Sequence, residues 1–136
     1  MKTPEIDPIF DLGEKNPYGA YFVGQSYLNM LTTQGVAVGN VTFEPGCRNN
    51  WHIHRARQGG GQILLCTAGR GWYQEWGKPA RALKAGDVVE IPANVKHWHG
   101  AAGDSWFSHL SLEVPGEDTS NEWLEPVEEA DYRQLS

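Results

Sequence analysis

The sequence predicts an all-β fold, a sandwich or barrel of short strands, and two observations support that class. The 136 residues include 16 glycines and 8 prolines, which recur at short intervals along the chain. Between them lie short runs rich in aromatic and β-branched residues, which favour a pleated, half-buried surface. Short strands between frequent turn residues are typical of sandwiches and barrels. The length suits one core, so we expect a single domain over residues 1–136.

The order of elements follows from these runs. Residues 1–20 are polar and contain Pro and Gly, which predicts an arm or an edge strand. Strands are predicted at residues 21–23, 27–31, 36–43, 52–54, 62–67, 72–76, 88–91, 97–100 and 105–113.

Turn residues separate the predicted strands. Glu44, Pro45 and Gly46 place Pro and Gly as a type II turn prefers. Residues 68–71 are expected to turn one strand into the next. Residues 55–61 are expected to form a loop, because three consecutive glycines hold regular structure only at an entropic cost.

The composition changes after residue 116, where the chain becomes acidic. Val127, Ala130 and Leu135 fall loosely on one helical face, which predicts a short C-terminal helical segment.

Charge and cysteine content exclude several classes of partner. The net charge is −6 without a basic run, which argues against nucleic acid or an anionic membrane as a partner. No apolar stretch approaches the roughly 18 residues of a membrane span, and residues 1–5 lack the apolar core of a signal peptide. Cys47 and Cys66 form no metal or redox motif, so we expect two reduced thiols in a cytoplasmic protein, with a disulfide as the alternative.

The histidines carry the strongest functional signal. Four of the five form two His-x-His pairs, His52 with His54 and His97 with His99. On a strand, residues i and i+2 point to the same face. Imidazole is the commonest protein metal ligand. The pattern therefore predicts a transition-metal site built from two distant strands.

The first His pair lies in a segment that resembles the first motif of the cupin superfamily. In that motif five residues separate a Gly from His-x-His, and six residues separate a Glu from a second Gly. Here Gly46 precedes His52 and His54 by that spacing, and Gln62 precedes Gly69. Gln62 therefore stands where the family usually has Glu.

The second pair resembles the second cupin motif. Gly86 is followed after five residues by Pro92, and His97 follows at the family spacing. Asn94 replaces the usual turn Gly, a mild change because Asn tolerates positive φ. Ala101 stands where the motif usually ends in Asn. The resemblance, strongest over residues 36–113, implies a double-stranded β-helix, the cupin jelly roll, with an N-terminal arm and the C-terminal helical segment.

One departure leaves the fourth ligand open. The gap from His54 to Gln62 is longer than usual in the family because of residues 55–61. Gln58, in contrast, lies at the usual family spacing from His54. We favour Gln62, since its six-residue step to Gly69 is kept.

A narrower resemblance concerns residues 16–31, 41–46, 51–54, 67–72, 96–101 and 121–126. These segments are similar to the small cupins grouped with carboxymuconolactone decarboxylase, a set that includes manganese-dependent cupin hydroxynitrile lyases. That set implies one divalent transition metal per chain, manganese first, with iron, nickel or zinc as alternatives. The implied ligands are His52, His54, Gln62 and His97.

Four neutral ligands leave the ion its full charge, which favours Lewis-acid chemistry on oxygen ligands. We therefore expect a lyase or a decarboxylase- or isomerase-like catalyst that acts on a small hydroxy, carbonyl or nitrile substrate. A metal-dependent dioxygenase ranks lower, because high-valent iron is better supported by a carboxylate ligand. The chain could instead be a non-catalytic metallo-cupin that binds a small ligand, or a cupin whose metal is structural.

Three residues are candidates for catalysis. His99 should share the cavity-facing side with His97 and is the natural proton mover. The alternative for His99 is a buried supporting role. His109 could line the same cavity or be a half-buried strand residue, and Asn49 could be a hydrogen-bonding wall residue or a turn residue.

Aromatic and basic residues give further expectations. One or two of Trp51, Trp72, Trp76, Trp98 and Trp106 are expected to line an apolar cavity wall. Arg55 and Arg57 are either solvated or attract an anionic substrate. Exposed sheet edges and the polar arm, together with family habit, predict a homodimer.

Overall fold

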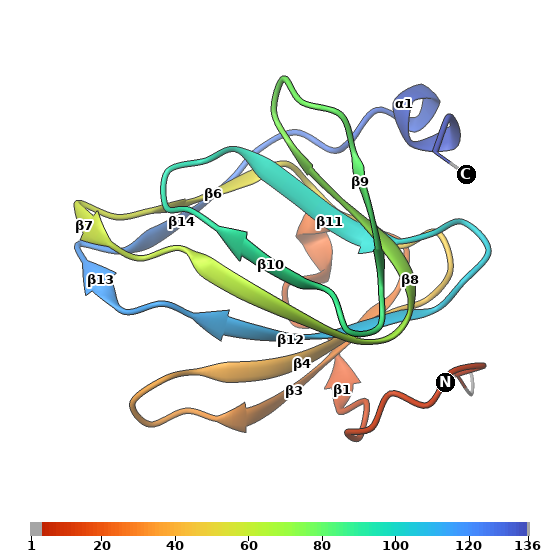
Figure 1. The fold of residues 1–136 in the computed structure, drawn as a ribbon, viewed down its shortest axis with the longest axis horizontal. Helices are drawn as coiled ribbons and strands as arrows, with labels where there is room; N and C mark the ends of the chain where they lie inside the picture. Colours follow the sequence, from red (N-terminus) through yellow and green to blue (C-terminus); the bar gives the residue numbers. More distant parts are fainter. Residues whose placement is uncertain (1–3, 136) are drawn as a thin grey trace.

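The protein is an all-β molecule in which two antiparallel sheets curl around a common core (Figure 1). The computed structural model describes residues 4–135, so residues 1–3 of the expected arm and residue 136 lie outside the described range. The strands are β1 (Glu14–Lys15), β2 (Phe22–Val23), β3 (Ser26–Thr32), β4 (Val38–Phe43), β5 (Arg48–Asn49), β6 (His52–Arg55), β7 (Gln58–Gly59), β8 (Gln62–Glu75), β9 (Arg81–Lys84), β10 (Val88–Ile91), β11 (His97–Ala101), β12 (Phe107–Glu113), β13 (Gly116–Glu117) and β14 (Ser120–Trp123). The helical elements are a short 3-10 helix, η1 (Gly19–Tyr21), and α1 (Glu129–Arg133).

The two sheets share β8. The first sheet has the order β1-β3-β4-β12-β8-β10, and the second has the order β2-β5-β11-β8-β9. β6 also pairs with β11, and β14 pairs with β6. This arrangement brings both His-x-His segments into the second sheet, at the face that looks toward the first.

The turn expected at residues 68–71 is wrong, because β8 continues through it as one 14-residue strand. Gly69 adopts φ +74°, and a Cβ there would overlap the carbonyl oxygen of Trp106. This glycine lets the strand bend closely against its neighbour instead of reversing. β8 therefore passes from the first sheet into the second, and its first residue, Gln62, faces the same core as the histidines.

The loop expected at residues 55–61 is partly wrong as well. Within it, β7 pairs with β13 to form a two-stranded ribbon at one end of the sheets (Figure 1). Exposed ion pairs of Arg57 with Glu117 (2.5 Å) and Asp118 (2.9 Å) link the two sides of the ribbon. The three glycines take positive φ values and allow the sharp path back to β8.

The remaining differences lie where strands lack an alternating pattern. The sequence did not predict β5, β9, β13 or β14, and Tyr21 belongs to η1 instead of the strand that follows it. Three of the four residues of β14 are exposed, so no apolar alternation marks it; its structure comes from pairing with β6. The turn at Gly46 (φ +83°) and the positive φ of Asn94 (68°) are as expected.

The main core lies between the sheets, and a second cluster lies under the C-terminal segment. The first contains Phe43, Leu64 and Phe107, all fully buried. Cys47 and Cys66 are buried, free thiols, and burial raises their pKa values to about 12 and about 11. Within residues 4–135, no helix is long and apolar enough to cross a membrane.

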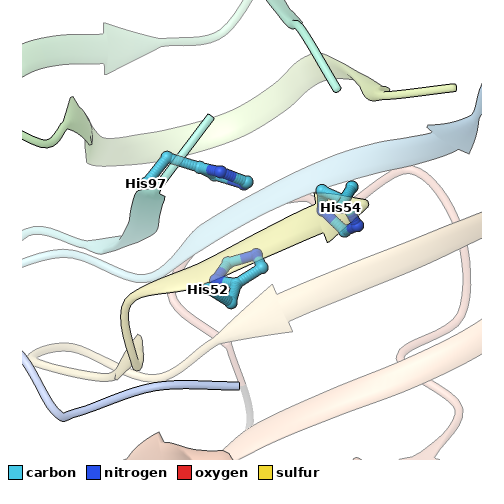
Figure 2. Close-up of side chains that lie close together, drawn as sticks. All are labelled: His52, His54 and His97. Carbon is cyan, nitrogen blue, oxygen red and sulfur yellow. The ribbon is translucent and has the colours of Figure 1, made fainter. Parts of the chain in front are cut away.

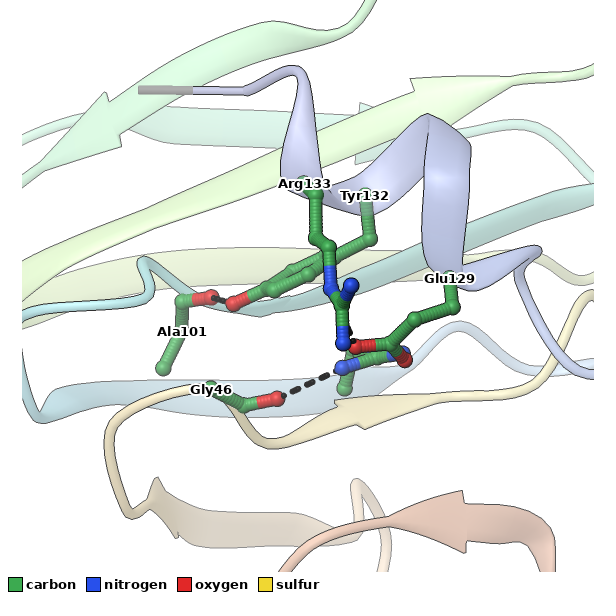
Figure 3. A network of polar contacts seen from close by, with 6 residues as sticks. Gly46, Ala101, Glu129, Tyr132 and Arg133 are labelled. Atoms are coloured by element: carbon green, nitrogen blue, oxygen red, sulfur yellow. Dashed lines mark hydrogen bonds and ion pairs between the residues drawn. The ribbon is translucent and has the colours of Figure 1, made fainter.

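The C-terminal helix confirms the expected short helical segment, but it is anchored by a different residue. Ala130 is exposed, whereas Tyr132 is buried and donates a hydrogen bond to the Ala101 carbonyl (2.6 Å). The Arg48 guanidinium lies 4.1 Å from the centre of the Tyr132 ring and pairs with Glu129 at 2.5 Å. Figure 3 shows this polar network, which ties the helix to the second sheet.

Candidate metal centre

Three histidines converge on one point between the sheets (Figure 2). His52 and His54 lie two apart on β6, so their rings share a face. The register pairs His52 directly with His97 of β11, which brings the third ring alongside. One ring nitrogen from each histidine lies within 4.8 Å of the other two, and all three residues are buried. This grouping could hold a metal ion.

The back of each ring is fixed by a hydrogen bond. Nδ1–H of His52 donates to the Asn50 carbonyl (2.8 Å), and Nδ1–H of His97 donates to the Val95 carbonyl (2.9 Å). Nδ1 of His54 lies 2.8 Å from the side-chain oxygen of Asn121. A neutral imidazole has one N–H, so the two backbone bonds leave the Nε2 lone pairs of His52 and His97 free on the inner side. Metal-binding histidines are usually oriented in this way.

The electrostatics of the rings also fit a cation. Burial lowers the pKa of His52 well below its usual value and that of His97 to about 4, and neighbouring histidines add to the effect. The neutral imidazole is the form that binds metal. Nε2 of His97 is buried without a hydrogen-bond partner, a costly state that a bound cation would relieve.

The structure brings Gln62, and not Gln58, to the three histidines. Gln62 is buried at the start of β8, and its Oε1 lies 3.1 Å from Nε2 of His54. Its amide nitrogen donates to Ser111 (3.1 Å) and faces the carboxylate of Glu113 (3.5 Å). Gln58 is exposed in β7.

A cavity of about 640 Å³ opens over these residues. Its polar part includes His52, His54, Gln62, His99 and Asn49. Its apolar part consists chiefly of Phe22, Leu28, Met30, Val41 and Trp123. We call it the metal-site cavity, and its two faces suit a small ligand with one polar and one apolar end.

His99 and Asn49 lie together on the wall of this cavity. The backbone N–H of His99 donates to Oδ1 of Asn49 (2.9 Å), which anchors the Asn49 amide. The Asn49 amide nitrogen then lies 3.3 Å from Nε2 of the His99 ring. Burial, and to a smaller extent the neighbouring His109 ring, lowers the pKa of His99 well below its usual value. Burial therefore favours the neutral form of the ring.

His109 does not line the metal-site cavity, although the sequence suggested that it could. It is fully buried behind His99, with their ring centres 5.0 Å apart, and does not belong to the residues that line the metal-site cavity. Phe43 and Phe107 pack around it, and burial lowers its pKa to about 4. Its Nε2 has no hydrogen-bond partner, and its Nδ1 lies 3.5 Å from Ser111.

The expected aromatic wall comes from other residues. None of the five tryptophans named for it lines the metal-site cavity; Trp123 of β14 does, together with Phe22. Trp51 and Trp76 instead line a separate surface groove, and Trp98 is fully buried. Arg55 borders the metal-site cavity but is paired with Glu122 at 2.9 Å.

Four residues of the site were not predicted as such: Ser111, Glu113, Asn121 and Trp123. Ser111 and Glu113 reach the site because β12 pairs with the start of β8. Asn121 and Trp123 reach it because β14 pairs with β6. The only sequence signal for the last two was the resemblance of residues 121–126 to the small cupins, which marks the segment without giving its role.

The curled antiparallel sheets and the three-histidine grouping together define the protein class. The chain belongs to the cupin domain family, whose model matches residues 39–112. It is also similar to (R)-mandelonitrile lyase of Granulicella tundricola, with 40% identity over 99 residues that cover 73% of this chain and 72% of that protein.

Solved structures agree on the jelly-roll fold. A cupin-like protein from Thermotoga maritima superposes with a TM-score of 0.82 at 44% identity, covering 94% of this chain and 96% of the other. A predicted oxalate decarboxylase from the same organism has a TM-score of 0.66 at 19% identity, covering 74% and 90% of the two chains. The second likeness concerns the fold alone.

Proposed function

We propose that this cupin is a metal-dependent lyase that cleaves, or in reverse forms, a 2-hydroxynitrile with an apolar substituent. The observation that carries the proposal is the meeting of the nitrogens of His52, His54 and His97 within 4.8 Å of one another, beside a cavity that His52, His54 and His99 line. The similarity to (R)-mandelonitrile lyase supports the choice of reaction.

We propose that His52, His54, His97 and Gln62 hold one divalent ion per chain. Nε2 of His54 and Oε1 of Gln62 lie 3.1 Å apart. Two ligand atoms each about 2.1 Å from an ion and at a right angle to each other are about 3.0 Å apart, so this pair fits a shared cation. Manganese is our first choice of metal, with iron, nickel and zinc as the alternatives.

The charges around the metal-site cavity favour a neutral substrate over a hydroxy acid. Of the charged side chains that line it, Arg55 is paired with Glu122, and Glu113 would repel an anion. The apolar side, with Phe22, Leu28 and Val41, suits an aryl or alkyl group. An ion held by four neutral ligands supplies Lewis acidity toward the substrate oxygen.

His99 is the residue that we propose to move the proton. Its neutral ring accepts the hydroxyl proton of the substrate, and the bond between the carbinol carbon and the nitrile carbon then breaks. The electron pair of that bond leaves with cyanide, which takes up the proton, so the products are an aldehyde and hydrogen cyanide. Asn49 holds the ring edge of His99 through its amide. His109 packs behind His99 and is proposed to support its position.

The test is an assay of mandelonitrile cleavage by protein stripped with a chelator and then reloaded with Mn²⁺. We expect benzaldehyde and cyanide from the reloaded protein and only the background rate from the stripped protein. Metal binding with no turnover of any hydroxynitrile would refute the lyase proposal and favour a non-catalytic metallo-cupin. Oxygen uptake coupled to substrate loss would favour the dioxygenase alternative.

We further propose a homodimer located in the cytoplasm. β3 pairs with β1 only at Tyr27 and Leu28, and the Asn29 amide donates to the Asp11 carbonyl, so the outer edge of β3 from Met30 to Thr32 is available for a second copy. Met30 and Val36, on and beside this edge, are exposed apolar residues. Two buried free cysteines support a reducing compartment.

A further inference from the structure

We infer that Asn121, on the C-terminal strand β14, is a positioning residue that sets the tautomer of His54 and so makes its Nε2 available to metal. The inference rests on the proposed metal site. Asn121 lies outside residues 39–112, the part of the chain that matches the cupin domain model.

The argument begins with the number of protons on the His54 ring. Both ring nitrogens face a side-chain amide oxygen: Nδ1 lies 2.8 Å from Oδ1 of Asn121, and Nε2 lies 3.1 Å from Oε1 of Gln62. A neutral imidazole has one N–H and can donate to only one of these acceptors. The two amides therefore compete for a single proton.

The outcome of that competition decides whether the ring can bind metal. With the proton on Nδ1, the Asn121 bond forms and the Nε2 lone pair faces the inside of the site. With the proton on Nε2, the ring donates to Gln62 and has no inner lone pair. The Asn121 contact is the shorter of the two, so we expect the metal-competent tautomer to dominate.

His54 differs from the other two histidines in the source of this support. His52 and His97 each donate to the backbone carbonyl two residues earlier, which local strand geometry supplies. His54 relies on a side chain 67 positions later in the sequence. A single substitution can therefore remove its acceptor, whereas the backbone acceptors of the other two cannot be removed in this way.

β14 holds Asn121 in place through its pairing with β6. The register sets Asn121 opposite His54 and Trp123 opposite His52. The Trp123 ring lies 4.7 Å from the His52 ring and stacks on Tyr21, also at 4.7 Å. The strand thus supports both histidines of the first pair from the same side.

The experiment compares three variants of the full chain. Asn121→Leu removes the acceptor at similar size, and Asn121→Asp keeps an acceptor oxygen. Glu122→Gln, the next residue on the strand, changes only the surface pair with Arg55 and is the control. For each protein, nitrogen NMR of the metal-free form gives the tautomer of His54, and titration with Co²⁺ gives the affinity and the visible spectrum.

We expect the Nδ1–H tautomer in the wild type, the control and Asn121→Asp, and a shift to the Nε2–H tautomer in Asn121→Leu. The affinity for Co²⁺ should fall about 10- to 100-fold in Asn121→Leu and should be restored in Asn121→Asp. A folded Asn121→Leu protein with the wild-type tautomer would overturn the inference, and so would one that binds Co²⁺ as tightly as a wild type that itself binds Co²⁺.

The two readouts separate this inference from the proposed function. If the wild type binds no Co²⁺ but the tautomer changes in Asn121→Leu, the positioning role stands and the metal-dependent lyase falls. If the wild type binds Co²⁺ and Asn121→Leu changes nothing, the metal site stands and the role of Asn121 falls.

Discussion

The Oε1 atom of Gln62 lies 3.1 Å from Nε2 of His54, and Oδ1 of Asn121 lies 2.8 Å from Nδ1 of the same histidine. When the ring proton is on Nδ1, as we propose, two atoms that each offer a lone pair face each other in a buried site. Such a contact is unfavourable unless a proton or a cation lies between them. The proposed metal ion, shared by the two atoms, would account for it, so removing either donor should weaken the binding of metal.

The first prediction concerns the fourth ligand. Gln62→Ala should lower metal affinity, because it removes one donor, whereas Gln58→Ala should leave affinity unchanged, because Gln58 is exposed. Gln62→Glu should retain the metal but slow turnover, since a carboxylate neutralises part of the ion's charge. Calorimetric titration with Mn²⁺ and a parallel assay check this. Equal losses at both glutamines would contradict it.

The second prediction concerns proton transfer. His99→Ala should keep about the wild-type metal content, since His99 does not belong to the group of three that could hold the ion. Turnover should fall about 10²- to 10⁴-fold, the usual contribution of a general acid or base. Elemental analysis and the rate of cyanide release measure the two quantities. Retained turnover would remove His99 from the mechanism.

The third prediction concerns pH. Burial lowers the pKa of His109 to about 4 from 6.5, so the unfolded chain binds this proton more readily than the folded protein does. The contribution of His109 to the free energy of unfolding is then fully present above pH 6.5. It falls by about 3 kcal/mol as the pH decreases toward 4. Urea unfolding of the metal-free protein between pH 7 and pH 4.5 should show a shallower decline in His109→Leu. Identical slopes in the two proteins would argue against a buried neutral His109.

The fourth prediction concerns the C-terminal helix. Tyr132→Phe removes the donor to the Ala101 carbonyl and should lower the free energy of unfolding by about 1–2 kcal/mol. Arg133→Met is the matched control, because its pair with Glu129 is solvent-exposed and such pairs contribute little. Chemical denaturation of both variants checks the difference. A larger loss of stability in Arg133→Met would show that the exposed ion pair, and not the buried hydrogen bond of Tyr132, holds the helix.

Local spacing explains why the grouping of the three histidines with Gln62 could be predicted. His52 and His54 share a face because a strand has a period of two, and that rule needs no tertiary information. The motif spacings around His97 and Gln62 then placed the other two donors. The structure brings these four side chains together, and it places exposed Gln58 elsewhere.

Long-range pairing explains what the sequence did not reveal. Asn121 reaches His54 only through the pairing of β14 with β6, and a polar four-residue strand has no alternating pattern that would reveal it. Gly69 was interpreted as a turn residue, whereas it allows β8 to approach Trp106 closely and continue. His109 lies behind His99 because of how β12 packs, which its own sequence neighbours do not indicate.

Metal content, measured by elemental mass spectrometry on untagged protein purified without chelators, tests the central claim most directly. We predict about one equivalent of a divalent transition metal per chain in the wild type and almost none in a His52→Ala, His97→Ala double variant that remains folded. Wild-type protein that contains no metal and takes none up on dialysis against Mn²⁺, Fe²⁺, Ni²⁺ or Zn²⁺ would contradict the proposed metal site.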